Sequence, residues 1–253
     1  MEFTGERYIP TLHNPEISYE HWHRYFYASQ FVSTKIVLDI ACGEGYGSNL
    51  LAESAQKVVG IDISNTTIEY ASSTYQKENL EFKAGSVSSI PVAGHEIFDV
   101  IISFETIEHI SENEQKVFLC EVVRLLKPNG IFIVSTPNKL LYSDIPGYKN
   151  EFHIKEFYID EFRKFLLTYF KNVSLLGQKI YPVSYIWNTP EKNSALAEFR
   201  LKYFDWGFGN TNDAKDQLYS IAIASSEDTH DLRNSVMVDL SERVIKVRDE
   251  NIC

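Results

Sequence analysis

Short apolar runs and stretches with helical spacing alternate along the chain from residue 35 to residue 136. The apolar runs are continuous and rich in β-branched residues, and they cover 35–40, 57–63, 80–85, 98–104 and 130–136. Such runs are typical of strands in a sheet that is covered on both faces. The stretches with helical spacing lie between them, at 47–56, 64–79 and 111–130. Strands that alternate with helices predict an α/β fold with a doubly wound, mostly parallel sheet.

The stretch 111–130 carries the clearest helical signals. Ser111 is a typical N-cap residue, and acidic residues fill the first turn after it. The expected apolar face consists of Val117, Leu119, Val122, Val123 and Leu126. The sequence Lys-Pro-Asn-Gly at 127–130 predicts the end of the helix.

Segments outside this pattern set the expected domain organisation. Residues 1–34 form an N-terminal segment with one predicted helix at 16–32, residues 35–225 form the main domain, and residues 226–253 form a helical tail. Within the main domain, the aromatic region 137–216 holds a further helix at 158–170. Strands predicted at 172–178 and 217–225 bring the sheet to seven strands. The tail has apolar positions at alternating three- and four-residue steps, which fits either a short coiled coil or an ordinary amphipathic helix.

The composition is that of a globular protein, with 44% hydrophobic and 23% charged residues among 253. The net charge of −11 repels phosphate backbones, so a nucleic acid is not the expected partner. No apolar run approaches the ~20 residues of a membrane span. The N-terminus lacks the basic-then-apolar pattern of a signal peptide. Together with three widely spaced cysteines, these features predict a cytoplasmic location.

A glycine-rich turn follows the first predicted strand, in the sequence VLDIACGEGYGSNLLAE at 37–53. Gly43, Gly45 and Gly47 occupy alternate positions in it. Glycines at such a turn permit unusual backbone angles and let a ligand approach the backbone closely, although such a turn also serves packing alone.

Two acids narrow the choice of ligand. Asp62 ends the next strand about 20 residues further on, where nucleotide-binding α/β folds place an acid that binds ribose hydroxyls. The glycine spacing differs from the Gly-x-Gly-x-x-Gly of dinucleotide enzymes, and no Gly-Lys-Ser/Thr follows that would make a P-loop. Asp39 precedes the first glycine by four residues, and it suits a cofactor with an ammonium group better than one with a pyrophosphate.

Four motifs in this order resemble those of the class I S-adenosylmethionine-dependent methyltransferases. VLDIACGEGYGS is similar to the first motif of that family, GIDIS to the second, FDVIISFETIEHI (98–110) to the fourth, and EVVRLLKPNGIFIVSTPN (121–138) to the helix and strand after it. The resemblance implies a Rossmann-like methyltransferase fold, with S-adenosyl-L-methionine as cofactor and S-adenosyl-L-homocysteine as product. One position departs from the pattern, because Ser86 stands where the family usually has an acid near the adenine.

The resemblance also implies which residues contact the cofactor. In the loops that end the strands they are Asp39, Ala41, Gly43, Gly45, Tyr46, Asp62, Ile63, Ser86, Val87 and Phe104. Arg24, in the N-terminal helix, is a candidate partner for the methionine carboxylate or for a phosphate on a sugar. This aromatic helix is expected to act as a lid that keeps water from the reactive sulfonium.

A sugar hydroxyl is a weak nucleophile, so its methylation benefits from a general base, and histidine suits that role at neutral pH. His109, after the fourth strand, and His153, after the fifth, are the candidate catalytic bases, and the alternative for each is a role in holding its own loop. The expected acceptor-binding residues are Glu105, Glu108, Tyr142, Asp144 and Tyr8. No His, Asp and Glu residues show metal-ligand spacing along the sequence, so no metal site is predicted.

The segments before residue 35 and after residue 136 indicate a particular group within the methyltransferase family. FTGERYIP…NPEISYEHWHRYFYA and TPNKLLYSD…NEFHIKEFYIDEF resemble methyltransferases of bacterial surface-polysaccharide and O-antigen synthesis. This implies O-methylation of a sugar hydroxyl on a nucleotide-sugar or lipid-linked glycan, with 137–216 on the acceptor side. Two alternatives stay open: a methyltransferase of a small aromatic, quinone-like or amine acceptor, and a non-catalytic assembly module. The tail helix is a candidate contact in a homo-oligomer or in an assembly with glycosyltransferases.

Overall fold

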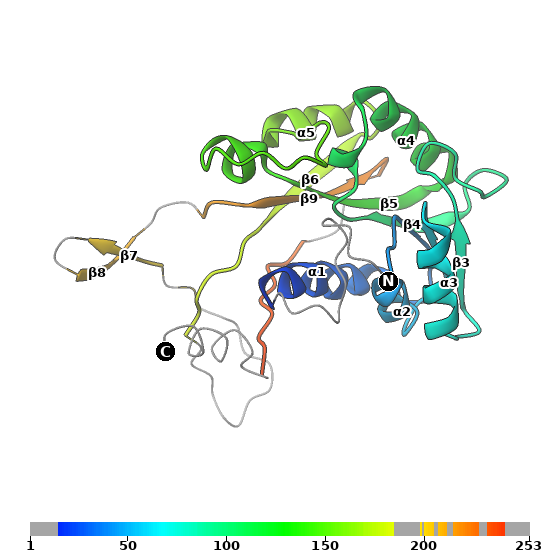
Figure 1. Cartoon of the computed structure of the whole chain (residues 1–253), viewed down its shortest axis with the longest axis horizontal. Helices are drawn as coiled ribbons and strands as arrows, with labels where there is room; N and C mark the ends of the chain where they lie inside the picture. Colours follow the sequence, from blue (N-terminus) through cyan, green and yellow to red (C-terminus); the bar gives the residue numbers. More distant parts are fainter. Residues whose placement is uncertain are drawn as a thin grey trace.

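The computed structural model describes residues 15–184, 198, 200–204, 207–211, 215–227 and 232–240. Its main feature is a seven-stranded sheet with the order β3-β2-β1-β4-β5-β9-β6 (Figure 1). The strands are β1 (Ile36–Ile40), β2 (Lys57–Asp62), β3 (Leu80–Ala84), β4 (Phe98–Ser103), β5 (Leu126–Pro137), β6 (Asn172–Gln178) and β9 (Tyr219–Ser225). β1 to β5 pair in parallel, and β9 runs antiparallel between β5 and β6. The predicted doubly wound, mostly parallel sheet is confirmed.

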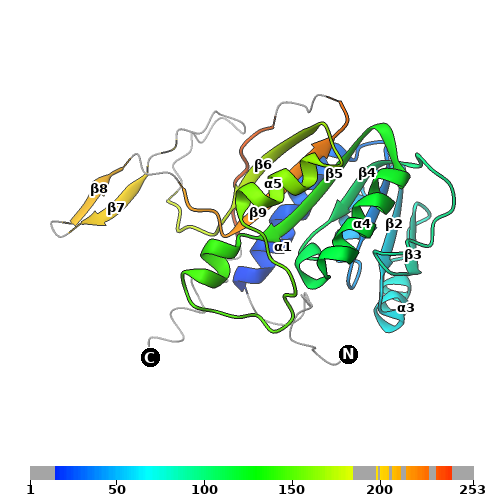
Figure 2. The same ribbon diagram turned by 90° about the horizontal axis from the view of Figure 1, so that it is seen from above.

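Helices cover both faces of this sheet. α1 (Pro15–Ala28) and α2 (Tyr46–Leu51) lie on one side, and α4 (Glu112–Leu125) and α5 (Ile159–Leu167) lie on the other (Figures 1 and 2). α3 (Asn65–Thr74) packs against β2 and β3. Alternate strand residues enter two separate cores. In β5, Phe132 packs with residues of α4 and α5, whereas Ile131 and Ile133 pack with residues of α1 and α2. This two-sided burial explains the unbroken apolar runs of the sequence.

α4 begins where its sequence predicts. The Ser111 hydroxyl accepts a hydrogen bond from Glu114 N, and the Glu114 carboxylate accepts one from Ser111 N, which completes a capping box.

The buried face of α4 differs from the expected one. Its buried residues are Gln115, Phe118, Leu119, Val122 and Leu125. Val117 and Val123, which the sequence places on this face, are 45% and 44% exposed. At 3.6 residues per turn, these two positions lie outside the apolar face of the helix. Leu126 belongs to β5, where it pairs with Phe98. The strand therefore begins before Gly130 and takes up the residues expected to end the helix.

The outer segments agree with the sequence in part. The predicted N-terminal helix is present as α1, and residues 1–14 lie outside the described part of the chain. The helix expected over 226–253 is absent from 232–240. These residues lie along α1 instead, where the Tyr27 hydroxyl donates to the Arg233 carbonyl oxygen (3.1 Å) and His23 Nε2 lies 2.9 Å from Ser235 Oγ. Polar contacts with α1 thus take the place of internal helical hydrogen bonds. Residues 241–253 lie outside the described part.

Residues 137–216 form the insertion region. Within it, β7 (Leu201–Phe204) and β8 (Gly207–Asn210) form a separate antiparallel pair, where the sequence indicates only an irregular aromatic stretch. Among the described residues, no helix combines the length and the apolar character that crossing a membrane requires.

The carboxyl ends of β1 and β4 form the switch point of the sheet, where doubly wound folds bind their ligands. The chain leaves both strands through a left-handed residue, Ala41 (φ +61°) after β1 and Glu105 (φ +49°) after β4. Left-handed backbone is uncommon for residues other than glycine and is often found at functional sites.

Candidate functional site

The glycine-rich turn between β1 and α2 offers open backbone at this edge of the sheet. Gly43 has φ +55°, and a Cβ placed on it would meet nothing within 4 Å. A Cβ on Gly45 would come within 2.6 Å of the Phe82 ring, and one on Gly47 within 2.0 Å of the Tyr25 ring. Gly43 therefore leaves space for a ligand, whereas Gly45 and Gly47 permit close packing around it.

Asp39 lies beneath this turn with no exposed surface. Its carboxylate accepts hydrogen bonds from Ser48 Oγ (2.6 Å) and from the Tyr25 hydroxyl (3.2 Å). Burial raises the pKa of Asp39 to about 7, although these hydrogen bonds act in the opposite direction. Asp39 therefore ties β1 to α1 and α2 and holds the turn in place, and the expected contact with an ammonium group would require its carboxylate to be uncovered.

Asp62 lies at the end of β2 and faces the same turn. Its Oδ2 accepts a hydrogen bond from Gly43 N (3.0 Å), and its Oδ1 accepts one from Ser64 N (2.9 Å). A carboxylate has about four lone-pair sites, so two adjacent hydroxyls can be accommodated as well. The next residue, Ile63, is 75% exposed, so it offers an apolar surface beside this carboxylate.

Ser86 and Val87 follow β3 at the same edge. Ser86 Oγ accepts a hydrogen bond from Ser88 N (3.2 Å), and Val87 is partly buried against the core. Ser86 thus shapes its own turn, and its contact with an adenine stays a prediction.

Aromatic side chains of α1 close the side of the turn. The Tyr46 ring lies 5.1 Å from the Trp22 ring and 5.4 Å from the Tyr25 ring, measured between centroids. The Tyr25 ring also meets the Phe104 ring edge-on at 5.1 Å. Tyr25 therefore brings together Tyr46 and Phe104, two residues that the sequence assigned to the cofactor, and fixes α1 beside the turn.

Arg24 of α1 is buried, with 2% of its surface exposed. Its Nη1 lies 3.3 Å from Glu105 Oε1 and donates to Gln178 Oε1 (3.1 Å), and its guanidinium lies over the Tyr219 ring. Glu20 lies close to this guanidinium. Burial raises the pKa of the Glu20 carboxyl group to about 7, although the charge of Arg24 acts in the opposite direction. Among the described residues, Arg24 Nε finds no hydrogen-bond partner. This donor is buried with the rest of the guanidinium, so the contact of Arg24 with the methionine carboxylate stays a prediction.

Glu105 is held by β5 as well as by Arg24. Glu105 N donates to Ser135 Oγ (3.1 Å), and that hydroxyl donates to Glu105 Oε1 (2.5 Å). The main-chain N–H and the carboxylate of Glu105 are therefore both held, which stabilises the left-handed backbone at this residue.

Glu108 lies in η2 (Ile107–His109), directly after β4, and is fully buried. Its Oε2 accepts a hydrogen bond from Thr136 Oγ1 (3.1 Å). Burial and the nearby Glu105 charge raise the pKa of Glu108 well above its ordinary range. The Glu108 carbonyl oxygen accepts hydrogen bonds from Ile154 N (2.8 Å) and Lys155 N (3.0 Å), which ties the insertion region to the end of β4.

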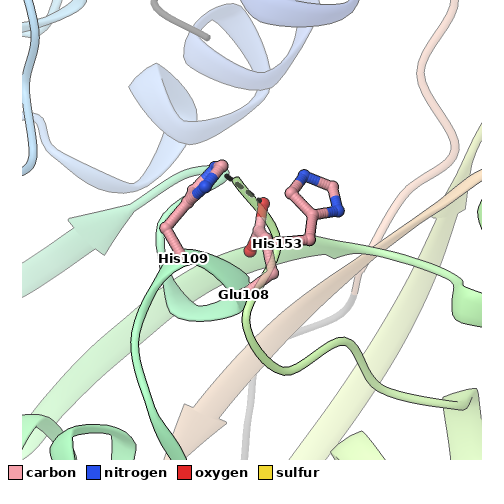
Figure 3. A group of neighbouring side chains, drawn as sticks. All are labelled: Glu108, His109 and His153. Atoms are coloured by element: carbon pink, nitrogen blue, oxygen red, sulfur yellow. Dashed lines mark ion pairs between the residues drawn. The ribbon is translucent and has the colours of Figure 1, made fainter. Parts of the chain in front are cut away.

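The two candidate bases lie side by side, with ring centroids 4.9 Å apart (Figure 3). His109 Nδ1 is 3.2 Å from the Phe152 carbonyl oxygen, and His153 Nδ1 is 2.5 Å from Glu156 Oε1. Both partners are acceptors, so Nδ1 carries the hydrogen of each neutral ring and Nε2 carries the lone pair. Figure 3 shows the Glu108 carboxylate between the two rings.

The acceptor side of the site is aromatic and charged. In η3 (Leu140–Asp144), the Tyr142 ring stacks on His153 at 5.2 Å, and Asp144 accepts a hydrogen bond from the Tyr158 hydroxyl (2.7 Å). A cavity of about 350 Å³ adjoins His153. Its lining includes Lys139, Tyr148, Lys149 and Lys155. Tyr8, also expected here, lies outside the described residues.

Comparison with known proteins agrees with this geometry. A family profile described as "Methyltransferase domain" matches residues 32–183. The chain belongs to this methyltransferase family. A protein of Mycolicibacterium smegmatis named "Probable S-adenosylmethionine-dependent methyltransferase" is 34% identical to it over 176 residues, or 66% of this chain and 64% of that protein.

A ubiquinone biosynthesis O-methyltransferase of Pelagibacter ubique is 37% identical over 107 residues, or 42% of this methyltransferase and 44% of that protein. The chain thus spans less than two thirds of the length of these relatives. The solved structure of the YcgJ protein from Bacillus subtilis shares the fold, with a TM-score of 0.56 and 19% identity over 82% of this chain and 100% of that one.

S-adenosyl-L-methionine is the cofactor of this methyltransferase family, and the residues of the turn fit it. Gly43 provides space for close approach, the Asp62 carboxylate can accept bonds from two adjacent ribose hydroxyls, and the exposed Ile63 offers an apolar surface to an adenine ring. These three features follow one another along the carboxyl ends of β1 and β2.

Sequence reasoning missed three residues of this methyltransferase site. Ser48 supports Asp39, Glu156 orients His153, and Tyr219 lies under Arg24. Only Glu156 has a local signal, because it stands three residues after His153 in a segment rich in charge. Tyr219 opens β9, and its contact with α1 depends on the order of strands in the sheet.

Proposed function

We propose that this methyltransferase transfers a methyl group from S-adenosyl-L-methionine to a hydroxyl of a carbohydrate, such as a nucleotide-sugar or a lipid-linked glycan. The observation that carries the proposal is the group of Glu108, His109 and His153 at the end of β4, the strand next to β1. A hydroxyl is a weak nucleophile that needs assistance to lose its proton. An amine acceptor would not require such a group.

The chain's residues hold and activate the acceptor. When bound, the cofactor supplies an electrophilic methyl group on a positively charged sulfur, and catalysis then depends mainly on alignment of the reactants. Nε2 of His109 or His153 is placed to take the hydroxyl proton. The Glu156 carboxylate at His153 Nδ1 orients that ring. The aromatic side chains of α1 limit access of water to the turn.

Aromatic rings and lysines support a carbohydrate acceptor that carries phosphate. Tyr142 and Tyr148 contact each other edge-on at 5.8 Å beside His153, and such rings pack well against the faces of sugars. Lys139, Lys149 and Lys155 line the adjoining cavity together with Asp144 and Glu156, and the three ammonium groups suit the phosphates of a nucleotide-sugar.

A phenol of a quinone-like molecule is the second candidate acceptor. It is favoured by the relatives named ubiquinone biosynthesis O-methyltransferase, which match about two fifths of this chain. The same aromatic rings suit a flat phenol, so the acceptor must be decided by assay.

Two measurements test the proposed function. Calorimetry with S-adenosylmethionine and S-adenosylhomocysteine should show saturable binding, and its absence would exclude the enzyme in favour of an assembly module. His109→Ala and His153→Ala should lower turnover while cofactor affinity stays near that of the parent protein. Full turnover in both variants would rule out a role for these imidazoles.

A further inference from the structure

We propose that Glu108, His109 and His153 bind a divalent cation, and that two adjacent oxygens of the acceptor complete its coordination. The acceptor half of this proposal rests on the proposed function, whereas the cation site stands on the geometry of three side chains. No spacing along the chain predicts this site, because His153 follows a different strand from Glu108 and His109.

The three side chains lie close to the spacing of ligands that share one ion. Each offers one ligand atom, and these atoms all lie within 4.8 Å of one another. His109 Nε2 is 3.8 Å from Glu108 Oε1. Ligand atoms around a tetrahedral zinc ion lie about 3.4 Å apart, as zinc–ligand distances of roughly 2.0–2.2 Å require. Small rotations of the side chains are therefore enough to close the site.

Hydrogen bonds on the far side of each ring orient both histidines as ligands. The Phe152 carbonyl oxygen fixes the hydrogen of His109 on Nδ1, and the Glu156 carboxylate does the same for His153. A carboxylate or carbonyl that accepts the second N–H of an imidazole is the usual support of a metal-binding histidine. Nε2 is therefore the nitrogen of each ring that would serve as the ligand atom.

Glu108 offers the acidic ligand of this site, since a bound cation displaces the carboxyl proton. Its Oε2 is held by Thr136, but its Oε1, the oxygen nearest to His109, is buried and finds no hydrogen-bond partner among the described residues. A buried carboxylate oxygen without a partner is costly. Together with two imidazole lone pairs it forms a set of acceptors, which a cation satisfies directly.

The chemistry of the ligands selects the type of ion. Two imidazole nitrogens and one carboxylate suit zinc, manganese, iron or cobalt better than magnesium or calcium, which favour oxygen ligands. Three protein ligands leave coordination positions open, as in catalytic metal sites. A vicinal diol of a sugar, or two adjacent hydroxyls of a phenol, can occupy two of them. The imidazoles then act as ligands, and the ion lowers the pKa of a bound hydroxyl in place of a histidine base.

The cation would also join two parts of the site. Glu108 and His109 follow β4, whereas His153 belongs to the insertion region that lines the acceptor cavity. Without an ion, Ile154 N and Lys155 N donate to the Glu108 carbonyl oxygen, and His109 Nδ1 lies 3.2 Å from the Phe152 carbonyl oxygen. A shared ion adds a direct link, so its binding should protect residues 150–156 from hydrogen exchange.

Metal binding can be measured without cofactor or acceptor. The full chain is stripped with a chelator and titrated with ZnCl₂, MnCl₂ or MgCl₂, and the visible spectrum of its Co²⁺ complex is recorded. We expect about one equivalent of Zn²⁺ or Mn²⁺, with Mg²⁺ binding more weakly. Glu108→Gln and His153→Gln should each reduce affinity by more than roughly 100-fold, and Glu156→Gln by roughly 10- to 100-fold. His95→Gln, an exposed histidine before β4, is the matched control and should bind like the parent chain.

Two results would overturn the cation site: no stoichiometric binding by the parent chain, or unchanged affinity in both Glu108→Gln and His153→Gln. Thermal unfolding of each variant in chelator shows whether it is folded, and His153→Gln, in a loop, keeps the test valid if the buried Glu108 variant fails. Methyl transfer that continues at full rate after chelation would overturn the acceptor half. Calorimetry with S-adenosylmethionine on the stripped protein separates these outcomes from failure of the proposed function.

Discussion

At the residue scale, Asp39 supports the glycine turn from below. It is fully buried between Ser48 and Tyr25, and its pKa is raised from 3.8 to about 7. The folded state therefore holds a proton that the unfolded chain has released, between these two pH values. The ionised form of Asp39 therefore destabilises the folded state, whereas the protonated form does not.

The free energy of unfolding should consequently fall as pH rises from about 4 to about 7, and this contribution should level off above that range. Asp39→Asn cannot titrate, so the difference in stability between variant and parent should shift in favour of the variant across the same window. Urea unfolding at a series of pH values measures both curves. Parallel curves would show that Asp39 does not hold a proton in the fold.

Asp62 is expected to act on the cofactor directly. Asp62→Ala removes the carboxylate that faces Gly43 N and should raise the dissociation constant for S-adenosylhomocysteine roughly 10- to 100-fold, since a hydrogen bond to a charged group contributes about 1.5–3 kcal/mol. Titration calorimetry measures this change. Asp160→Asn, on the exposed first turn of α5, is the control. Equal affinity in Asp62→Ala and parent would show that the ribose lies elsewhere.

The sequence identifies residues of the cofactor half better than those of the acceptor half. Gly43 and Asp62 stand at fixed places after two predicted strands, so local pattern and spacing locate them. Glu108 and His153 meet only because hydrogen bonds from Ile154 and Lys155 fold the insertion region onto η2. No spacing along the chain encodes that contact.

At the element scale, α1 is joined to α2 by the packing of Tyr25 on Gly47. A Cβ at Gly47 would lie 2.0 Å from the Tyr25 ring, so any side chain there displaces the ring that also contacts Asp39 and Phe104. The absence of a side chain at Gly47 is thus what allows α1 to close over the turn.

Gly47→Ala should destabilise the fold by about 1–3 kcal/mol, the usual range for overpacking, and should weaken cofactor binding as α1 moves away. Denaturant unfolding and calorimetry measure the two effects. Gly147→Ala is the matched control, because its Cβ would meet nothing within 4 Å and only its positive φ adds strain. If both variants lost equal stability, the contact with Tyr25 would not matter.

Hydrophobic period predicts most elements of this fold to within a few residues, because each strand of the sheet is covered on both faces. Prediction fails where tertiary contacts decide. β5 begins at Leu126 because Phe98 pairs with it. Residues 232–240 lie along the surface of α1, although their apolar spacing indicates a helix. The alternating period of the tail indicates a helix, but it carries no information about the surface on which the tail packs.

At the scale of the whole molecule, Arg24 links the N-terminal helix to distant strands. Its guanidinium contacts Glu105 after β4, Gln178 at the end of β6 and Tyr219 at the start of β9. These contacts connect α1 and the end of β4, beside the glycine-rich turn, with β9 and the edge strand β6.

Arg24→Met should lower stability by roughly 3–5 kcal/mol, because it leaves the Glu105 carboxylate, whose side chain is only 15% exposed, without its cation. The double variant Arg24→Met/Glu105→Gln should recover part of this loss. Arg163→Met, on the exposed side of α5, is the control. Urea unfolding of the parent, Arg24→Met, Glu105→Gln and the double variant completes the cycle, and additive losses would show that Arg24 and Glu105 are not coupled.

The most direct test is to follow the methyl group itself. The protein is incubated with S-adenosylmethionine that carries a deuterated methyl group, and with nucleotide-sugars, lipid-linked glycans and phenols that have adjacent hydroxyls. Mass spectrometry detects transfer, and NMR locates the label. We expect a labelled methyl ether on one hydroxyl of a sugar, formed together with an equal amount of S-adenosylhomocysteine. A labelled nitrogen or sulfur, or bound cofactor that methylates no hydroxyl, would contradict this expectation.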